Sequence, residues 1–159
     1  MITDPILTRL GRLVGRWTTE ATHPSMPGVV VHGTATIEWL EGERFLTIRA
    51  RVDHPDFPDS LSVIGNFEHD RVDGATRSVP EEATTSLRMH YFDSRGVFRL
   101  LEASIDDAAW RLSRLAPGFS QRFTGTFTDG GNTIVGLWEL CEDDVHWAND
   151  LAITYRREG

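Results

Sequence analysis

The feature that most constrains the fold is a long succession of short β-type runs separated by turn residues. From residue 16 onward, runs rich in Thr, Val, Ile, Phe and Trp alternate with Gly, Asp and Asn clusters. Segments such as EGE (41–43), DSRG (93–96), DD (106–107), APG (116–118) and DGGN (129–132) are typical of tight hairpins. The pattern predicts ten strands: Arg16–Thr22, Val30–Leu40, Arg44–Asp53, Leu61–Glu68, Thr85–Asp93, Val97–Ser104, Ala109–Leu115, Gln121–Thr128, Thr133–Cys141 and Trp147–Arg157.

Strands joined by short hairpins form an up-and-down antiparallel sheet, and such a sheet has two open edges unless it closes on itself. We therefore predict one all-β domain over residues 1–159, an antiparallel barrel of about ten strands. Barrels of about eight strands are filled by their own side chains, so a wider barrel leaves interior space for water or a ligand. The polar connection His69–Ala83 is expected to be a mobile loop.

A short helix or 3₁₀ turn is predicted before the first strand. Asp4 and Pro5 provide an N-cap and a first-turn residue, and Gly15 ends the segment. Apolar residues recur between them at helical spacing, namely Ile6, Leu7, Leu10, Leu13 and Val14.

Charge and composition exclude several classes of partner. The formal net charge of −8 argues against nucleic acid or an anionic membrane, because both need a basic face. No apolar window reaches the roughly 18 to 20 residues that span a bilayer, and the N-terminus does not resemble a secretory signal. Cys141 is the sole cysteine, and the six histidines lack metal-ligand spacing. We expect a cytoplasmic protein without a metal or a resident cofactor.

Aromatic residues are the best indication of a ligand. Trp39, Trp110 and Trp138 lie on different predicted strands, and Tyr91 adds a further ring. Tryptophan in a wide barrel provides an apolar wall with N–H donors, which suits a hydrophobic or planar ligand, although the same rings can serve as core. Arg122, beside a predicted turn, is either a ligand for a carboxylate or phosphate or a solvated rim residue.

Two titratable residues inside predicted strands are further candidates. Strand alternation places His90 with Arg88 and Phe92 on one face, and Met89 with Leu87 and Tyr91 on the other, and leaves open which face is inward. Glu102 either projects into a pocket, where burial would raise its pKa, or faces outward. A turn centred between Ser94 and Arg95 would pair His90 with Arg99 and Glu102 with Leu87, so that His90 and Glu102 would not oppose each other.

Gly15-Arg16-Trp17 after a short helix, an antiparallel meander and a final Tyr155-Arg156-Arg157 resemble the calycin superfamily. The resemblance implies that Trp17 plugs one end of the barrel, with Arg156 or Arg157 stacked over its indole. The chain is most similar to ten-stranded nitrobindin-like barrels and to a bacterial family of uncharacterised lipocalin-like proteins. The motifs that carry this resemblance cover nearly the whole chain: PGVVVHGTATIEWLEGERFL, DFPDSLSVIG, HYFDSRGVFR, APGFSQRFTGTF and LAITYRR.

Two positions depart from these relatives. Asp150 occupies the place of the axial histidine in the nitrobindin-like haem proteins, and Asp is a poor haem ligand. Ile153 occupies the place of the arginine with which fatty-acid-binding proteins hold a carboxylate. We therefore expect binding of a small hydrophobic ligand in the barrel. The alternatives are an enzyme using His90, Glu102 or Asp150 as acid or base, and a disfavoured haem protein. Similar barrels form homodimers, so a dimer is also possible.

Overall fold

The computed structural model describes residues 4–66 and 87–159. All ten predicted strands are present, with small shifts of the bounds that the structure describes. The predicted His69–Ala83 loop lies outside the described residues, as do positions 67–68 and 85–86 of the two predicted strands that flank it. The elements are α1 (Pro5–Leu10), η1 (Gly11–Leu13), β1 (Gly15–Thr22), β2 (Val31–Trp39), β3 (Phe45–Val52), β4 (Ser60–Gly65), β5 (Leu87–Asp93), β6 (Phe98–Ile105), β7 (Ala109–Arg114), β8 (Ser120–Thr128), η3 (Asp129–Gly131), β9 (Thr133–Cys141) and β10 (Ala148–Arg157).

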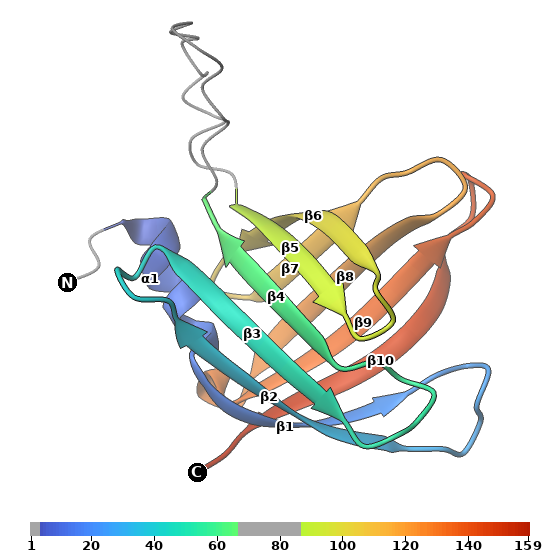
Figure 1. The fold of residues 1–159 in the computed structure, drawn as a ribbon, viewed down its shortest axis with the longest axis horizontal. Helices are drawn as coiled ribbons and strands as arrows, with labels where there is room; N and C mark the ends of the chain where they lie inside the picture. The colour runs from blue at the N-terminus through green and yellow to red at the C-terminus, as the bar shows by residue number, and fades with distance from the viewer. Residues whose placement is uncertain (1–3, 67–86) are drawn as a thin grey trace, which may run out of the picture.

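The strands form one closed antiparallel barrel, as predicted (Figure 1). Each strand pairs with the next along the chain, and β1 closes the barrel by pairing with β10, where Trp17 lies opposite Arg157. The predicted turns provide the left-handed backbone that tight hairpins need: φ is +94° at Gly42, +82° at Gly96 and +77° at Gly118. Closure leaves the sheet without an edge.

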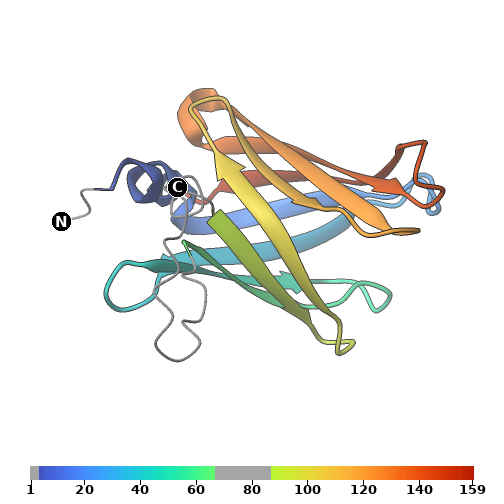
Figure 2. The ribbon, with the colours of Figure 1, turned by 90° about the horizontal axis from the view of Figure 1, so that it is seen from above.

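The two ends of the barrel differ. Helix α1 lies at one end, beside the C-terminus (Figure 2). Asp4 caps it, because the Asp4 carboxylate accepts a hydrogen bond from the Ile6 amide at 2.9 Å. The leucines of α1 and η1 pack on this end, where side chains are fully or almost fully buried: Leu10, Leu13, Trp17, Leu46, Ile64, Leu87 and Ile134. We call this end the sealed end. The opposite end, which we call the open rim, is bounded by the connections 23–30, 53–59, 94–97, 115–119 and 142–147.

Trp17 is the plug of the sealed end. Its indole is fully buried, and its Nε1 donates a hydrogen bond to the Leu13 carbonyl at 2.9 Å. The guanidinium carbon of Arg157 lies 4.2 Å from the centre of the Trp17 ring. Of the two arginines named from the sequence, Arg157 therefore covers the indole. Arg156 faces outward and pairs with Glu20 at 3.3 Å, because adjacent strand residues point to opposite faces.

The β5–β6 hairpin corrects the predicted register by one residue. His90 lies opposite Leu100, and Glu102 lies opposite Arg88. The reason is a three-residue connection, Ser94 to Gly96, in which the Asp93 amide donates to the Val97 carbonyl at 3.0 Å. A two-residue turn centred between Ser94 and Arg95 would give the register that we predicted, and the extra residue shifts it.

Candidate ligand site

Strand alternation decides which candidate residues reach the interior. On β5, Leu87 and Met89 belong to the buried core, and Tyr91 packs against it, so these three residues face inward. His90 is therefore on the outer face, where its ring lies 6.1 Å from that of Phe98. Glu102 is also on the outer face, with its side chain 61% exposed and 3.6 Å from Arg88.

Arg122 also lies outside the interior, on the outer face of β8 near the rim. Its guanidinium donates two hydrogen bonds of 2.9 Å to the Glu139 carboxylate and lies 4.1 Å from the centre of the Trp147 ring. These hydrogen bonds with Glu139 are the main reason that the pKa of Arg122 is raised. The Arg122 guanidinium is thus paired with Glu139 along one edge and stacked on Trp147 with one face, and both contacts lie on the outer side of the barrel.

Four rings form a continuous patch on the inner wall: Tyr155, Trp110, Phe123 and Trp138. We call this patch the aromatic wall. The ring centres lie 6.2 Å apart for Tyr155 and Trp110, 5.1 Å for Trp110 and Phe123, and 5.1 Å for Phe123 and Trp138. At its deep end, Tyr155 meets the plug Trp17 edge to face at 6.4 Å. The predicted residues Trp110 and Trp138 are thus brought together, whereas Trp39 lies at the sealed end against Gly11.

A pair of glycines makes room for the centre of the wall. Gly125 on β8 lies opposite Gly136 on β9, and neither has a left-handed backbone. A Cβ at Gly136 would lie 2.6 Å from Phe123 Cε2, and one at Gly125 would lie 3.0 Å from the same ring. The Phe123 ring therefore packs directly on the backbone of two strands. Glycine inside a strand signals such a close approach, and this signal in the sequence was missed.

The donors of the wall have no acceptors among the described residues, and two of them, on Trp110 and Tyr155, belong to adjacent rings. Trp110 is 3% exposed, and its Nε1 has no partner within the described residues. The Tyr155 hydroxyl makes no hydrogen bond with residues 4–66 or 87–159 either, and burial raises its pKa to about 12. Tyr155, unlike the sealed-end residues, retains some accessible surface. Tyr155 was not among the binding residues expected from the sequence.

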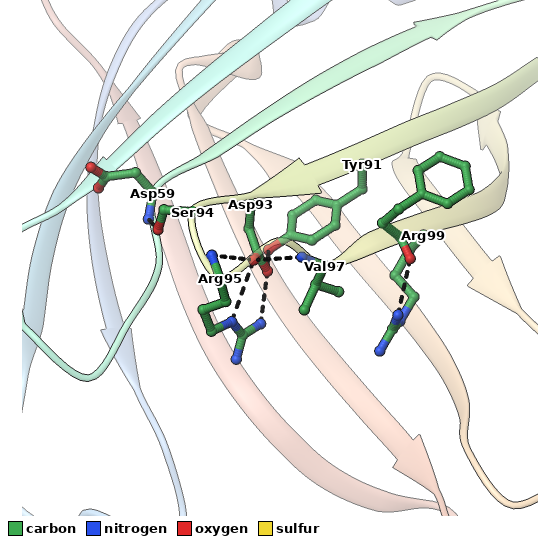
Figure 3. A network of polar contacts seen from close by, with 8 residues as sticks. Asp59, Tyr91, Asp93, Ser94, Arg95, Val97 and Arg99 are labelled. Carbon is green, nitrogen blue, oxygen red and sulfur yellow. Dashed lines mark hydrogen bonds and ion pairs between the residues drawn. The ribbon is translucent and has the colours of Figure 1, made fainter.

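A polar network stabilises the β5–β6 turn, which is one part of the rim (Figure 3). Tyr91 donates its hydroxyl proton to Asp93 at 2.8 Å, and Asp93 also accepts bonds from Arg95 and from the Val97 amide. Burial opposes ionisation of Asp93, but the bonds from Arg95 and Tyr91 outweigh it and lower the Asp93 pKa to about 2. Burial first, and then the bond to ionised Asp93, raise the pKa of Tyr91. The network fixes the β5–β6 turn as part of the rim.

Asp150 lies on another part of the rim, where its carboxylate is hydrogen-bonded to His23. This pair was not predicted from the sequence. Asp150 Oδ1 lies 2.6 Å from His23 Nε2, and His23 Nδ1 lies 2.7 Å from Ser25 Oγ. The Ser25 amide also donates to His23 Nδ1 at 3.1 Å, so this nitrogen is the acceptor and Nε2 carries the proton toward Asp150. His23 and Asp150 border a depression of about 260 Å³.

Residues 4–66 and 87–159 contain no group of three His, Cys, Asp or Glu residues placed to hold a metal ion. Within the same ranges, no helix has the length and apolar character needed to cross a bilayer.

A closed ten-stranded antiparallel barrel with a short helix at one end gives this chain a calycin-like fold. Solved structures agree with this class. The crystal structure of Rv2717c from M. tuberculosis is similar with a TM-score of 0.66 and 12% identity, over 98% of this chain and 99% of that chain. The S-type phycobiliprotein lyase CPES from Guillardia theta is similar with a TM-score of 0.58 and 9% identity, over 99% and 94%. At these identities the likeness shows the fold alone. No family model matches the chain, and no curated protein matches its sequence.

Proposed function

We propose that this protein binds a small hydrophobic or planar ligand inside its barrel, against the aromatic wall. The unpartnered Nε1 of Trp110 carries the proposal. A buried donor without an acceptor costs about 1–3 kcal/mol, and a ligand atom that accepts its proton recovers that cost. The surrounding rings of Phe123 and Tyr155 provide the apolar surface on which a planar body stacks.

Tyr155 narrows the chemistry of the ligand. A tyrosine phenol is protonated at neutral pH, and burial raises the pKa of Tyr155 further, to about 12, so its hydroxyl is available as a second donor. The two donors lie on adjacent, touching rings, so they suit a carbonyl, ether or hydroxyl oxygen of the ligand. We therefore expect a flat, largely apolar molecule that directs an oxygen toward Trp110 and Tyr155.

The test uses the solvatochromic probe 6-propionyl-2-(dimethylamino)naphthalene, which is planar and carries a carbonyl. We expect saturable binding with a blue-shifted emission. Trp110→Phe keeps a ring and removes the donor, and should weaken binding about fivefold or more, since a hydrogen bond contributes about 1 kcal/mol net. Trp147→Phe alters a tryptophan stacked under Arg122 on the outer wall and is the matched control.

The outcomes separate the interior from the surface. Selective loss of affinity in Trp110→Phe supports binding at the wall. Absence of saturable binding by the wild-type protein, or equal losses in both variants, would contradict the proposal. Circular dichroism and thermal unfolding of each variant provide the check that folding is intact.

A hydrolytic function is the alternative, and one arrangement on the rim favours it. Asp150, His23 and Ser25 are bonded in the order carboxylate, imidazole, hydroxyl, which is the connectivity of a serine nucleophile activated by histidine. If this alternative holds, the protein hydrolyses p-nitrophenyl butyrate, and both His23→Ala and Ser25→Ala abolish the turnover. Turnover that survives either substitution, or no turnover in the wild-type protein, rejects it.

A further inference from the structure

We infer that the ligand carries an anionic head group, and that Arg99 and Arg114 hold this group at the open rim. The inference rests on the proposed function, because it assumes an apolar body in the barrel and adds the charge and orientation of the molecule. It concerns two arginines that were not among the binding residues expected from the sequence, although Arg99 ends the motif HYFDSRGVFR.

Both arginines belong to the inward-facing rows of their strands. Arg99 on β6 lies opposite Tyr91, which packs on the core. Figure 3 shows Arg99 and Tyr91 on the same side of the β5–β6 hairpin. Arg114 is the last residue of β7, two positions beyond the buried Leu112 and four beyond Trp110 of the aromatic wall. Each arginine therefore lies on a strand whose inward row leads from the rim to the interior.

Phe119 brings the two side chains to one place. Arg114 Nη1 donates to the Phe119 carbonyl at 2.9 Å, and the guanidinium carbon of Arg99 lies 5.8 Å from the centre of the Phe119 ring. Arg99 Nη1 donates to the Phe98 carbonyl at 2.9 Å. Each guanidinium thus uses one N–H on a backbone carbonyl, and its other N–H groups have no acceptor among residues 4–66 and 87–159.

Neither arginine has a carboxylate within ion-pair distance in the described structure. Several acidic residues of the same rim bond to other groups: Asp93 to Arg95 and Tyr91, Asp144 to the Gly118 amide at 2.7 Å, and Asp150 to His23. Arg88, Arg95, Arg111, Arg122 and Arg156, in contrast, all have acidic partners. These five are the described arginines with an ion pair. The other nine of the fourteen described arginines have none, and Arg99 and Arg114 differ from most of those nine because they lie half-buried in inward-facing rows at the rim.

This arrangement favours an amphipathic anion. A guanidinium binds a carboxylate, sulfonate or phosphate through paired N–H bonds, and these bonds strengthen where water is partly excluded. The two arginines lie at the rim and the aromatic wall lies inside the barrel. The ligand is therefore expected to enter with its apolar body first. Its charged head remains between Arg99 and Arg114. Its body reaches toward Trp138 and Phe123.

The experiment compares two probes with the same body, 4-(naphthalen-1-yl)butanoate and its uncharged methyl ester, by isothermal titration calorimetry at low salt. We expect the wild-type protein to bind the acid about tenfold or more tightly than the ester, the factor that about 1.4 kcal/mol provides. The double variant Arg99→Gln/Arg114→Gln should lose about tenfold for the acid and less than twofold for the ester. Added salt should reduce the preference for the acid.

Arg49→Gln/Arg51→Gln is the matched control, because both residues are exposed on the outer face of β3 and removing them changes the net charge equally. If the control loses as much affinity for the acid as the rim variant, the effect is long-range charge and the inference is wrong. Equal binding of acid and ester by the wild-type protein also overturns it, while leaving the proposed function intact. If neither probe binds, the proposed function fails and this inference fails with it. If the acid binds as expected, comparison with its sulfonate and phosphate analogues identifies which anion the rim prefers.

Discussion

Replacement of Arg157 by methionine should destabilise the protein far more than the same change at the adjacent Arg156. Arg157 stacks on the buried Trp17 indole and donates hydrogen bonds to the Val14 carbonyl and, at 2.8 Å, to the Arg12 carbonyl. These contacts join the end of β10 to the segment between η1 and β1. Arg156 makes one ion pair, with Glu20, in which the two side chains are 54% and 50% exposed.

The expected magnitude follows from these contacts. A desolvated cation–π contact contributes about 2 kcal/mol, and a hydrogen bond from a charged group about 1.5–3 kcal/mol. Burial lowers the pKa of Arg157, which shows that desolvation of its charge offsets part of this gain. A net loss of about 3 kcal/mol is reasonable, equivalent to a fall in Tm of about 6–12 °C for a chain of this size. An exposed ion pair contributes about 0–1 kcal/mol, so Arg156→Met should be nearly neutral.

Urea denaturation followed by far-ultraviolet circular dichroism measures both variants under the same conditions. Arg157→Lys provides an intermediate case, because its ammonium keeps the charge over the indole but lacks the planar fork that reaches two carbonyls. If the free energies of unfolding of Arg157→Met and Arg156→Met differ by less than about 0.5 kcal/mol, the assigned role of Arg157 is refuted.

Gly15→Ala should lower the free energy of unfolding by about 2 kcal/mol or more, because φ at Gly15 is +146° and a Cβ there would lie 2.5 Å from Arg157 Nη1. Chemical denaturation tests this prediction, and an unchanged free energy of unfolding would contradict it. Gly136→Ala should displace the Phe123 ring, so that the naphthalene carbonyl probe binds more weakly while circular dichroism shows a folded barrel. The Asp93 pKa is lowered to about 2, below an unfolded value of about 3.9, so Asp93 stabilises the fold above about pH 4 and this contribution is lost as pH falls toward 2. Asp93→Asn should flatten the decline in stability over that range by about 1–2 kcal/mol, and an unchanged pH profile would exclude this role. A homodimer stays a prediction from similar barrels, and sedimentation equilibrium decides it.

The barrel could be predicted from the sequence because its signals are local. Hairpin residues, alternation within strands and the helix cap at Asp4 each act over a few residues, and ten such segments leave closure as the way to remove the edges. The Trp17 plug was predicted by resemblance, and in the structure the Trp17 side chain is fully buried beneath the Arg157 guanidinium. The choice between Arg156 and Arg157 required the register of β10 against β1, which one residue reverses.

The candidate site was predictable only in part, because strand patterning does not identify the inner face of a strand with mixed residues. The outer row of β5 combines the polar Arg88 and His90 with Phe92. The inner row combines the apolar Leu87 and Met89 with Tyr91 and Asp93, so neither row is wholly polar or wholly apolar. Packing of the aromatic wall depends on contacts between strands that are distant along the chain, as for Trp110 and Tyr155. Whether Arg99 and Arg114 form ion pairs depends on acidic residues from other strands and connections, and no local sequence pattern contains that information.

The chain of rings from the plug to the wall gives the protein a built-in optical reporter. Trp17, Tyr155, Trp110, Phe123 and Trp138 follow one another at centre-to-centre distances of 5.1 to 6.4 Å in fixed, asymmetric orientations. Rigidly packed aromatic side chains generate near-ultraviolet circular dichroism, which disappears when the packing loosens. A molecule that stacks on the wall would therefore change the chiral spectrum of the protein itself. Binding of a ligand could therefore be followed in unlabelled protein by near-ultraviolet circular dichroism.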